Sequence, residues 1–187
     1  MISNKHDYLR YKEQDLLKNN FDSSFLSYFT NDIWKFLRLL RRVEYIINTK
    51  NSSLYLPLKV LTLYRFKSIS KKLGYSIPPN VCGAGLILHH YGNIVINEKC
   101  RIGDNCKIHI GVNIGGNNGK GLTPQIGNNC YIGPGAKIFG DVLLGDSCQI
   151  GANAVVNKSF PEFGHVIVGI PAKSIRRIYD DKSNKEL

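Results

Sequence analysis

The feature that most constrains the fold is a six-residue repeat in the second half of the chain. A period of six matches neither the 3.6-residue turn of a helix nor the two-residue alternation of a long strand. It suits a coil of three short strands with a corner after each, so that one coil takes about 18 residues and the repeated side chains stack inside. The repeated positions are aliphatic from residue 96 to residue 156, interrupted only by Lys120: Ile96, Ile102, Ile108, Ile114, Ile126, Ile132, Ile138, Leu144, Ile150 and Val156.

The same period accounts for the cysteines. All five are separated by multiples of six and therefore occupy one row of the coil: Cys82, Cys100, Cys106, Cys130 and Cys148. A row has none of the convergent pairs that a disulfide framework or a zinc site needs, and the chain contains no CxxC motif. We expect reduced cysteines that pack as small apolar side chains, as in a reducing compartment.

Composition divides the chain into two architectures. Residues 1–76 carry 14 basic and six acidic residues and 13 of the 19 aromatics, whereas 17 of the 18 glycines lie between Gly83 and Gly169. We expect a mainly β protein with an α-helical N-terminal region (1–75), a coil (76–170) with a loop at 115–125, and a tail (171–187). No apolar run reaches the roughly 18 residues of a membrane span, and the N-terminus lacks a secretory signal, so a soluble, cytoplasmic protein is expected.

Residues 1–76 show helical spacing. Asn31 is a candidate N-cap for a helix whose apolar face would carry Phe36, Leu40, Val43 and Ile47, with Arg38, Arg41 and Arg42 off that face. A second helix is expected from about 57 to 72 with Gly74 as its stop signal, and a third within 5–18. The basic faces have three possible uses: a solvated surface, a funnel for an anionic substrate, or peripheral contact with an anionic membrane.

The loop at 115–125 is rich in glycine and asparagine. It is only superficially similar to a nucleotide-binding P-loop, because Gly121 and not a serine or threonine follows Lys120. We therefore exclude a P-loop. A loop of this composition on a rigid scaffold is more typical of a functional site than of a stabilising element.

The repeats resemble those of the left-handed β-helix acyltransferases, and within them the serine acetyltransferase branch. The segments that carry the resemblance cover about half the chain: Leu88 to Ile96, the Ile114-Gly115-Gly116 loop, Gly133-Pro134-Gly135-Ala136-Lys137-Ile138, and Val168-Gly169-Ile170-Pro171-Ala172-Lys173. The resemblance implies the left-handed twist, a homotrimer with active sites between subunits, and acetyl-CoA as co-substrate without a metal.

The sequence departs from the serine acetyltransferase pattern at the acceptor. That family has Asp-His where this chain has His89-His90, a second loop His where Thr123 stands, and an upstream Asp where the matching stretch begins at Tyr75. The Gly-Gly-Asn-Asn-Gly-Lys-Gly-Leu-Thr-Pro loop is similar to those of O-acetyltransferases of capsular and surface polysaccharides. We expect a sugar hydroxyl as acceptor, with serine O-acetyltransferase as the alternative.

The resemblance implies a histidine base. An alcohol is a poor nucleophile at neutral pH until a base takes its proton, and His90 matches the family's catalytic histidine. Residue 90 shares the phase of Ile96 and would point inward in a regular coil, so the role requires irregular backbone at 89–93. His89 is expected to contact the acceptor or to orient His90, and otherwise lies on the surface. Weaker candidates for a histidine at the site are His109, His165 and His6. Further residues expected to contact the acceptor are Tyr91, Asn117 and Thr123.

Several residues are expected to bind acetyl-CoA. The backbone N–H groups of Gly115 and Gly116 are candidates for the oxyanion site. Candidates for the pantetheine arm are Ala136, Ala152 and Ala154, for which coil packing alone is the alternative, and candidates for the phosphates are Lys120, Lys137, Lys158, Lys173, Arg176 and Arg177.

Other classes of function fit less well. A zinc site of the β-helical carbonic anhydrase type needs three converging histidines, and the His-x4-His spacing of that family is missing here. A non-catalytic scaffold protein is a further alternative. The net charge of +11 has no nucleic-acid-binding motif beside it, so no nucleic-acid partner is expected.

Overall fold

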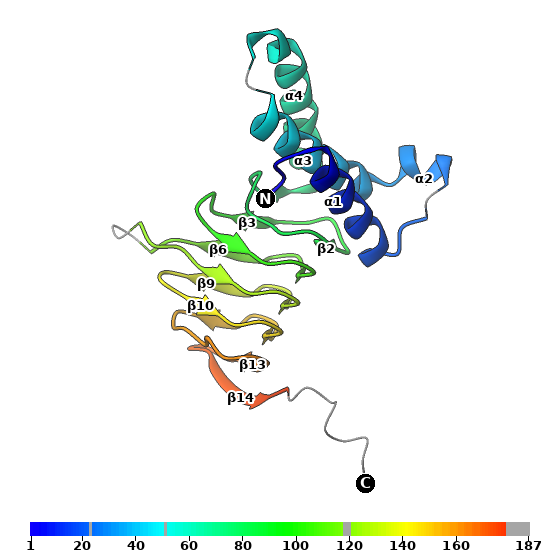
Figure 1. The fold of residues 1–187 in the computed structure, drawn as a ribbon. Helices are drawn as coiled ribbons and strands as arrows, with labels where there is room; N and C mark the ends of the chain where they lie inside the picture. The colour runs from blue at the N-terminus through cyan, green and yellow to red at the C-terminus, as the bar shows by residue number, and fades with distance from the viewer. Residues whose placement is uncertain (23, 51, 118–120, 179–187) are drawn as a thin grey trace.

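The computed structural model describes residues 1–22, 24–50, 52–117 and 121–178. A group of helices stands at one end of a stack of coils, and the C-terminal strand closes the other end (Figure 1). The helical elements are α1 (Lys5–Lys18), α2 (Phe25–Thr30), α3 (Asp32–Thr49), the short 3-10 helix η1 (Ser53–Tyr55) and α4 (Leu56–Leu73). Among the described residues, no helix is both long and apolar enough to cross a membrane.

Short strands of two to five residues build the coils. Their bounds are β1 (Tyr75–Ser76), β2 (Ile87–Leu88), β3 (Ile94–Ile96), β4 (Arg101–Ile102), β5 (Lys107–Ile108), β6 (Asn113–Gly115), β7 (Gln125–Ile126), β8 (Tyr131–Ile132), β9 (Lys137–Phe139), β10 (Leu143–Leu144), β11 (Gln149–Ile150), β12 (Val155–Val156), β13 (His165–Val168) and β14 (Lys173–Arg177). They form three sheets, ordered β1-β3-β6-β9-β12, β10-β7-β4 and β14-β13-β11-β8-β5-β2.

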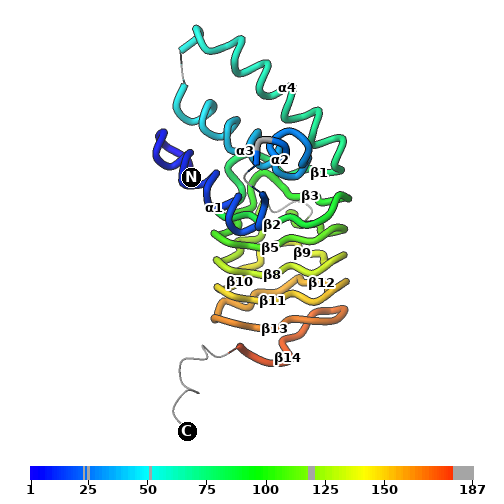
Figure 2. The backbone as a smooth tube through the Cα atoms, turned by 90° about the vertical axis from the view of Figure 1, so that its right-hand side faces the viewer, coloured from blue at the N-terminus to red at the C-terminus, as the bar shows by residue number. Residues whose placement is uncertain are grey.

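The pairing register confirms coils of 18 residues. Val95 pairs with Asn113 and Lys137 with Val155, each 18 residues further along. Asn113 pairs with Lys137, which is 24 residues further along and so one six-residue repeat more than a coil of 18. The loop at 115–125 accounts for the additional repeat. All pairs are parallel except β13 with β14, so strands at equivalent positions lie one above another, as in a left-handed β-helix (Figure 2).

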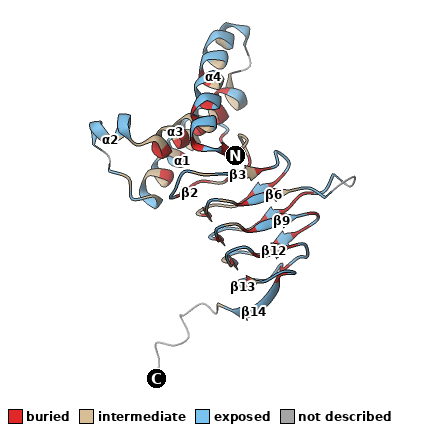
Figure 3. Cartoon of the chain, turned by 180° about the vertical axis from the view of Figure 1, so that it is seen from behind, coloured by how far each residue is buried: buried red, intermediate tan, exposed pale blue. Residues whose placement is uncertain are grey.

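The inside of the coil is filled by the rows that the sequence predicts. Every aliphatic residue of the repeat is buried, none more than 5% exposed. The five cysteines are free and buried, which confirms the expected apolar row. Figure 3 shows this as a buried strip along the inner side of the strands, continuous with the buried faces of the lower helices.

The helices begin and end largely where the sequence predicts. Asn31 caps α3 by accepting a hydrogen bond from the Trp34 N–H, and Gly74 ends α4 with a left-handed φ of 77°. α2 and η1 were not expected from the spacing. Ile47 was wrongly placed on the buried face of α3, since its side chain is 42% exposed near the end of that helix.

Arg41 corrects the expectation that the three arginines of α3 lie on a basic outer face. Its side chain is fully buried and forms ion pairs with Asp15 of α1 and Glu44 of α3. It also donates to the carbonyls of Cys82 and Gly83 in the first coil. Burial, the largest influence on Asp15, raises the pKa of its carboxyl, and Arg41 opposes that rise. This buried network joins α1, α3 and the coil into one unit.

Candidate active site

The backbone between β2 and β3 is irregular. Val95 follows Ile87 by eight positions, whereas their partners Asn113 and Lys107 are six positions apart. The two additional residues bulge outward, so His89 and His90 are exposed although residue 90 has the phase of an inward-pointing position. Gly92 within the bulge has a φ of 145°, which favours glycine. The irregularity expected at 89–93 is therefore present.

Three histidines lie together beside this bulge. The ring centroid of His89 lies 6.3 Å from that of His90 and 5.8 Å from that of His109, whose ring is 5.1 Å from Tyr131. Burial lowers the pKa of His89, helped by Lys107 and His90. Burial and then His89 lower the pKa of His109, whose Nε2 atom is buried with no hydrogen-bond partner. His89 and His109 are thus held as neutral imidazoles at neutral pH.

A buried tyrosine that the sequence did not single out contacts this segment. The Tyr75 hydroxyl donates to the backbone carbonyl of His90 at 2.8 Å, and the ring packs edge-on against Phe36 with centroids 5.0 Å apart. Burial raises the pKa of Tyr75, so the hydroxyl keeps its proton and stays a donor. Tyr75 stands in the stretch where the family pattern has an orienting Asp. The only signal in the sequence was that mismatch.

Asp15 of α1 and Asn19, the residue directly after this helix, hold β2 from its open edge. Asn19 donates through Nδ2 to the Leu86 carbonyl at 2.8 Å and accepts from the Leu88 N–H at 3.0 Å. Asp15 accepts from the Leu86 N–H at 2.9 Å. These bonds imitate a neighbouring strand directly before His89. No spacing pattern marks such a contact, because it joins residues about 70 positions apart.

A cavity of about 440 Å³ opens beside His90. It is lined by residues from the α1–α2 connection, the end of α2, the start of α3 and the bulge: Phe21, Thr30, Asn31, Ile33, His89, His90 and Tyr91. The polar lining groups are a hydroxyl, an amide, a phenol and imidazoles. No carboxylate and no lysine or arginine is among these lining residues, so the cavity suits a neutral polar group better than a zwitterion.

The glycine loop at 115–125 carries five of the expected site residues, of which the structure describes four. Gly115 ends β6, and Gly116 is exposed where an added Cβ would come within 3.2 Å of the Leu122 carbonyl. Asn117 is exposed, and Lys120 lies outside the described residues. Thr123 is buried, and its side chain is hydrogen-bonded to the Cys100 thiol, which directs it toward the coil. Neither Asn117 nor Thr123 lines the cavity beside His90.

The alanines expected beside the cofactor differ in their surroundings. Ala136 and Ala154 are fully buried, and the N–H and carbonyl of each are engaged in backbone hydrogen bonds of the coil. Ala152 is exposed at a corner. Coil packing therefore explains Ala136 and Ala154 without a cofactor, while Ala152 is free to face one.

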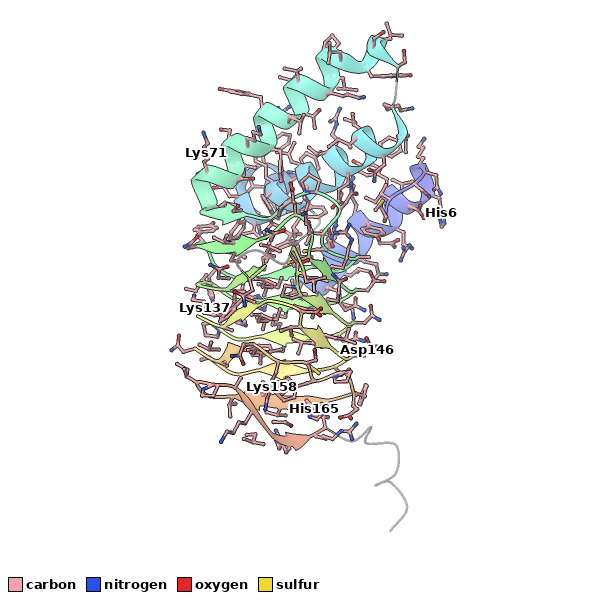
Figure 4. The ribbon with its side chains drawn as sticks, turned by 90° about the vertical axis from the view of Figure 1, so that its left-hand side faces the viewer. His6, Lys71, Lys137, Asp146, Lys158 and His165 are labelled. Carbon is pink, nitrogen blue, oxygen red and sulfur yellow. The ribbon has the colours of Figure 1, made fainter. Side chains whose placement is uncertain are left out.

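The basic candidates for the cofactor phosphates are exposed on the lower coils and on β14. Lys137 and Lys158 lie at different heights of the stack (Figure 4). Lys137 Nζ donates to the Gly111 carbonyl, and Lys173, Arg176 and Arg177 follow one another along β14.

The remaining histidines lie apart from the cluster. His165 is bonded to Ser174 and Glu162, each at 2.7 Å, near the lower end of the stack, and His6 lies on α1 (Figure 4). Within the described part of the chain, no group of three His, Cys, Asp or Glu side chains is placed to hold a metal ion.

Comparison with known proteins agrees with the repeat. Residues 123–158 match the family model described as bacterial transferase hexapeptide, six repeats. A search of curated proteins found no match. This match covers only part of the chain, and together with the coils it supports a protein of the hexapeptide acyltransferase type.

Solved structures with the same fold are serine acetyltransferases. The enzyme of Neisseria gonorrhoeae is 25% identical, with a TM-score of 0.74 over 96% of this chain and 71% of that one. A serine acetyltransferase in complex with CoA is 25% identical, with a TM-score of 0.71 over 91% and 71%. The soybean enzyme complexed with serine is 23% identical, with a TM-score of 0.73 over 91% and 70%, and supports the fold alone.

Proposed function

We propose that the protein transfers an acetyl group from acetyl-CoA to a hydroxyl, with His90 as the general base. The observation that carries this proposal is the outward bulge, which takes His90 out of the coil and places it on a cavity next to two other imidazoles. The acyltransferase class and the acetyl-CoA co-substrate are confirmed by the hexapeptide match and by the relative solved with CoA.

The chemistry follows from the groups at the cavity. The imidazole of His90 takes the proton of the acceptor hydroxyl while the oxygen attacks the thioester carbonyl. The tetrahedral intermediate carries a negative oxygen, for which we propose the backbone N–H groups of Gly115 and Gly116. As the intermediate collapses, the C–S bond breaks and the imidazolium returns the proton to the CoA thiolate.

We propose that CoA runs along the outside of the lower coils toward β14. Lys137 and Lys158 are exposed on these coils, and the cations of β14 supply the charge for the adenosine phosphates. Because His90 and β14 lie toward opposite ends of the stack, the cofactor has to span several coils. We propose that a second copy packs against this face and encloses CoA, within the homotrimer that the resemblance implies.

For the acceptor we propose a carbohydrate hydroxyl. The cavity lining offers neutral hydrogen-bonding groups and the aromatic rings of Phe21 and Tyr91, a combination that binds a polyol. Free serine is a zwitterion and needs a carboxylate and a cation, which the described lining residues do not supply. Serine is nevertheless the second candidate, because the solved structures reported above are serine acetyltransferases and therefore favour it.

Release of CoA thiol tests both acceptors. The purified protein is given acetyl-CoA with either serine or a mixture of capsular oligosaccharides, and His6→Gln serves as control for His90→Gln. We expect turnover with the oligosaccharides, abolished by His90→Gln and kept by His6→Gln. Equal or faster turnover with serine would reverse the choice of acceptor, and full activity of His90→Gln would refute the base.

A further inference from the structure

A second hollow lies in the helical region and has no histidine among its lining residues. It has a volume of about 220 Å³ and is lined from all four α-helices. Five cations line it, and we call it the basic hollow. They are Lys12 of α1, Lys35, Arg38 and Arg42 of α3, and Arg65 of α4. No aspartate or glutamate is among its lining residues.

The charge of the basic hollow is not compensated by an ion pair within the described part of the chain. Among the described residues, none of its five cations forms an ion pair, whereas Arg41 and Lys72 nearby each have a carboxylate partner. Five positive charges around one small volume repel one another. An anion placed among them offsets this repulsion.

The guanidinium of Arg38, one of the lining cations, is held in a fixed plane. Its guanidinium lies over the ring of Tyr28, with Cζ 3.3 Å from the ring centroid, and it donates to the Tyr28 carbonyl. Its Nε atom is buried and has no hydrogen-bond partner. A guanidinium held in a fixed plane is suited to the oxygen atoms of a phosphate.

The basic hollow is separated from the cavity beside His90 by α2. Tyr28 and Phe29 of this helix line the basic hollow, and the next residues, Thr30 and Asn31, line the cavity. A ligand that occupies both hollows would have to extend past the end of α2. The two hollows lie next to each other along the same segment of chain.

We propose that the basic hollow binds the phosphate or diphosphate group of the acceptor, whose sugar hydroxyl reaches His90. This inference rests on the proposed function and specifies it: the acceptor is a phosphorylated or diphosphate-linked sugar. A diphosphate matches five cations better than the single charge of a carboxylate does. A flat anionic bilayer fits less well, because the hollow is concave and is lined from all four α-helices.

Binding of inorganic pyrophosphate to the full-length protein tests the site without any acetyl transfer. Isothermal titration calorimetry compares the wild type with the double variant Arg42→Gln/Arg65→Gln. The matched control, Lys67→Gln/Lys71→Gln, removes the same charge from exposed positions of α4 outside the hollow. We expect affinity to fall about tenfold or more in the first variant and little in the control, since charge-assisted hydrogen bonds are lost only there.

The outcomes separate this site from its competitors. Equal loss of affinity in both double variants, or no binding by the wild type, overturns the proposal. Binding to vesicles of anionic phosphatidylglycerol without binding to pyrophosphate also overturns it and assigns the surface to a membrane. Should Arg42→Gln/Arg65→Gln fail to fold, Lys12→Gln/Lys35→Gln replaces it in the same comparison.

A kinetic arm connects the site to the reaction. With a sugar 1-phosphate and the same unphosphorylated sugar as acceptors, the first double variant should raise KM for the phosphorylated sugar alone, with kcat unchanged. An equal KM for the two sugars in the wild type contradicts the proposal. If the proposed function itself is wrong, neither sugar is acetylated, while pyrophosphate binding and its loss in the variant are unaffected.

Discussion

Replacing Tyr75 with Phe removes one hydrogen bond and little else. The ring is 4% exposed and packs against Phe36, so the phenyl group of the variant keeps that contact. The lost bond is the one from the hydroxyl to the His90 carbonyl, 2.8 Å long. A bond of this kind contributes about 0.5–1.5 kcal/mol, toward the lower end when the carbonyl can bind water instead.

If this bond holds His90 in position for catalysis, kcat falls by about two- to tenfold, since about 1.4 kcal/mol corresponds to a factor of ten. The affinity for CoA, measured by calorimetry, stays unchanged. Tyr11→Phe is the control, because Tyr11 is also 4% exposed and its hydroxyl accepts from the N-terminal amine of Met1. A Tyr75→Phe variant with lower thermal stability but wild-type kcat would refute the positioning role, leaving the bond as a structural one.

Three other variants test the remaining parts of the site and its support. His90→Gln should lower kcat about a hundredfold or more with CoA affinity kept, and a loss below tenfold in steady-state assays would argue against a general base. The lowered pKa of His109 means that the unfolded chain binds a proton first, so stability falls as pH drops below about 6.5, and His109→Gln should flatten this dependence in thermal melts at several pH values. Arg41→Met leaves Asp15 and Glu44 buried without their cation and should cost about 3–5 kcal/mol of unfolding free energy in denaturant titrations, whereas a cost under about 1 kcal/mol would show that the network is not stabilising.

The coil was predictable because its period is a purely local signal. Each Ile or Val of the repeat faces inward whatever lies elsewhere in the chain, and the cysteine row follows from the same arithmetic. Helix ends were predictable for a similar reason, since Asn31 and Gly74 act on their own backbone neighbours.

The errors concern residues whose surroundings come from distant segments. Arg41 reads as a surface cation until Asp15 and the first-coil carbonyls are placed around it. Ile47 has the right spacing for the core, but no other segment covers that end of α3. The support given by Tyr75 and Asn19 was invisible for the same reason, because each contacts a backbone group that carries no sequence signature.

The two ends of the coil stack have different closures, and together they limit its growth. A parallel coil has no internal stop, because each new turn exposes the same ladder of N–H and carbonyl groups to whatever arrives next. At the lower end β14 runs back against β13, so the outermost strand points the wrong way to template another turn. At the upper end the carboxylate of Asp15 and the amide of Asn19 occupy the ladder positions beside β2. At this sheet, neither end of the coil stack offers a free parallel strand on which a further copy could continue the coil.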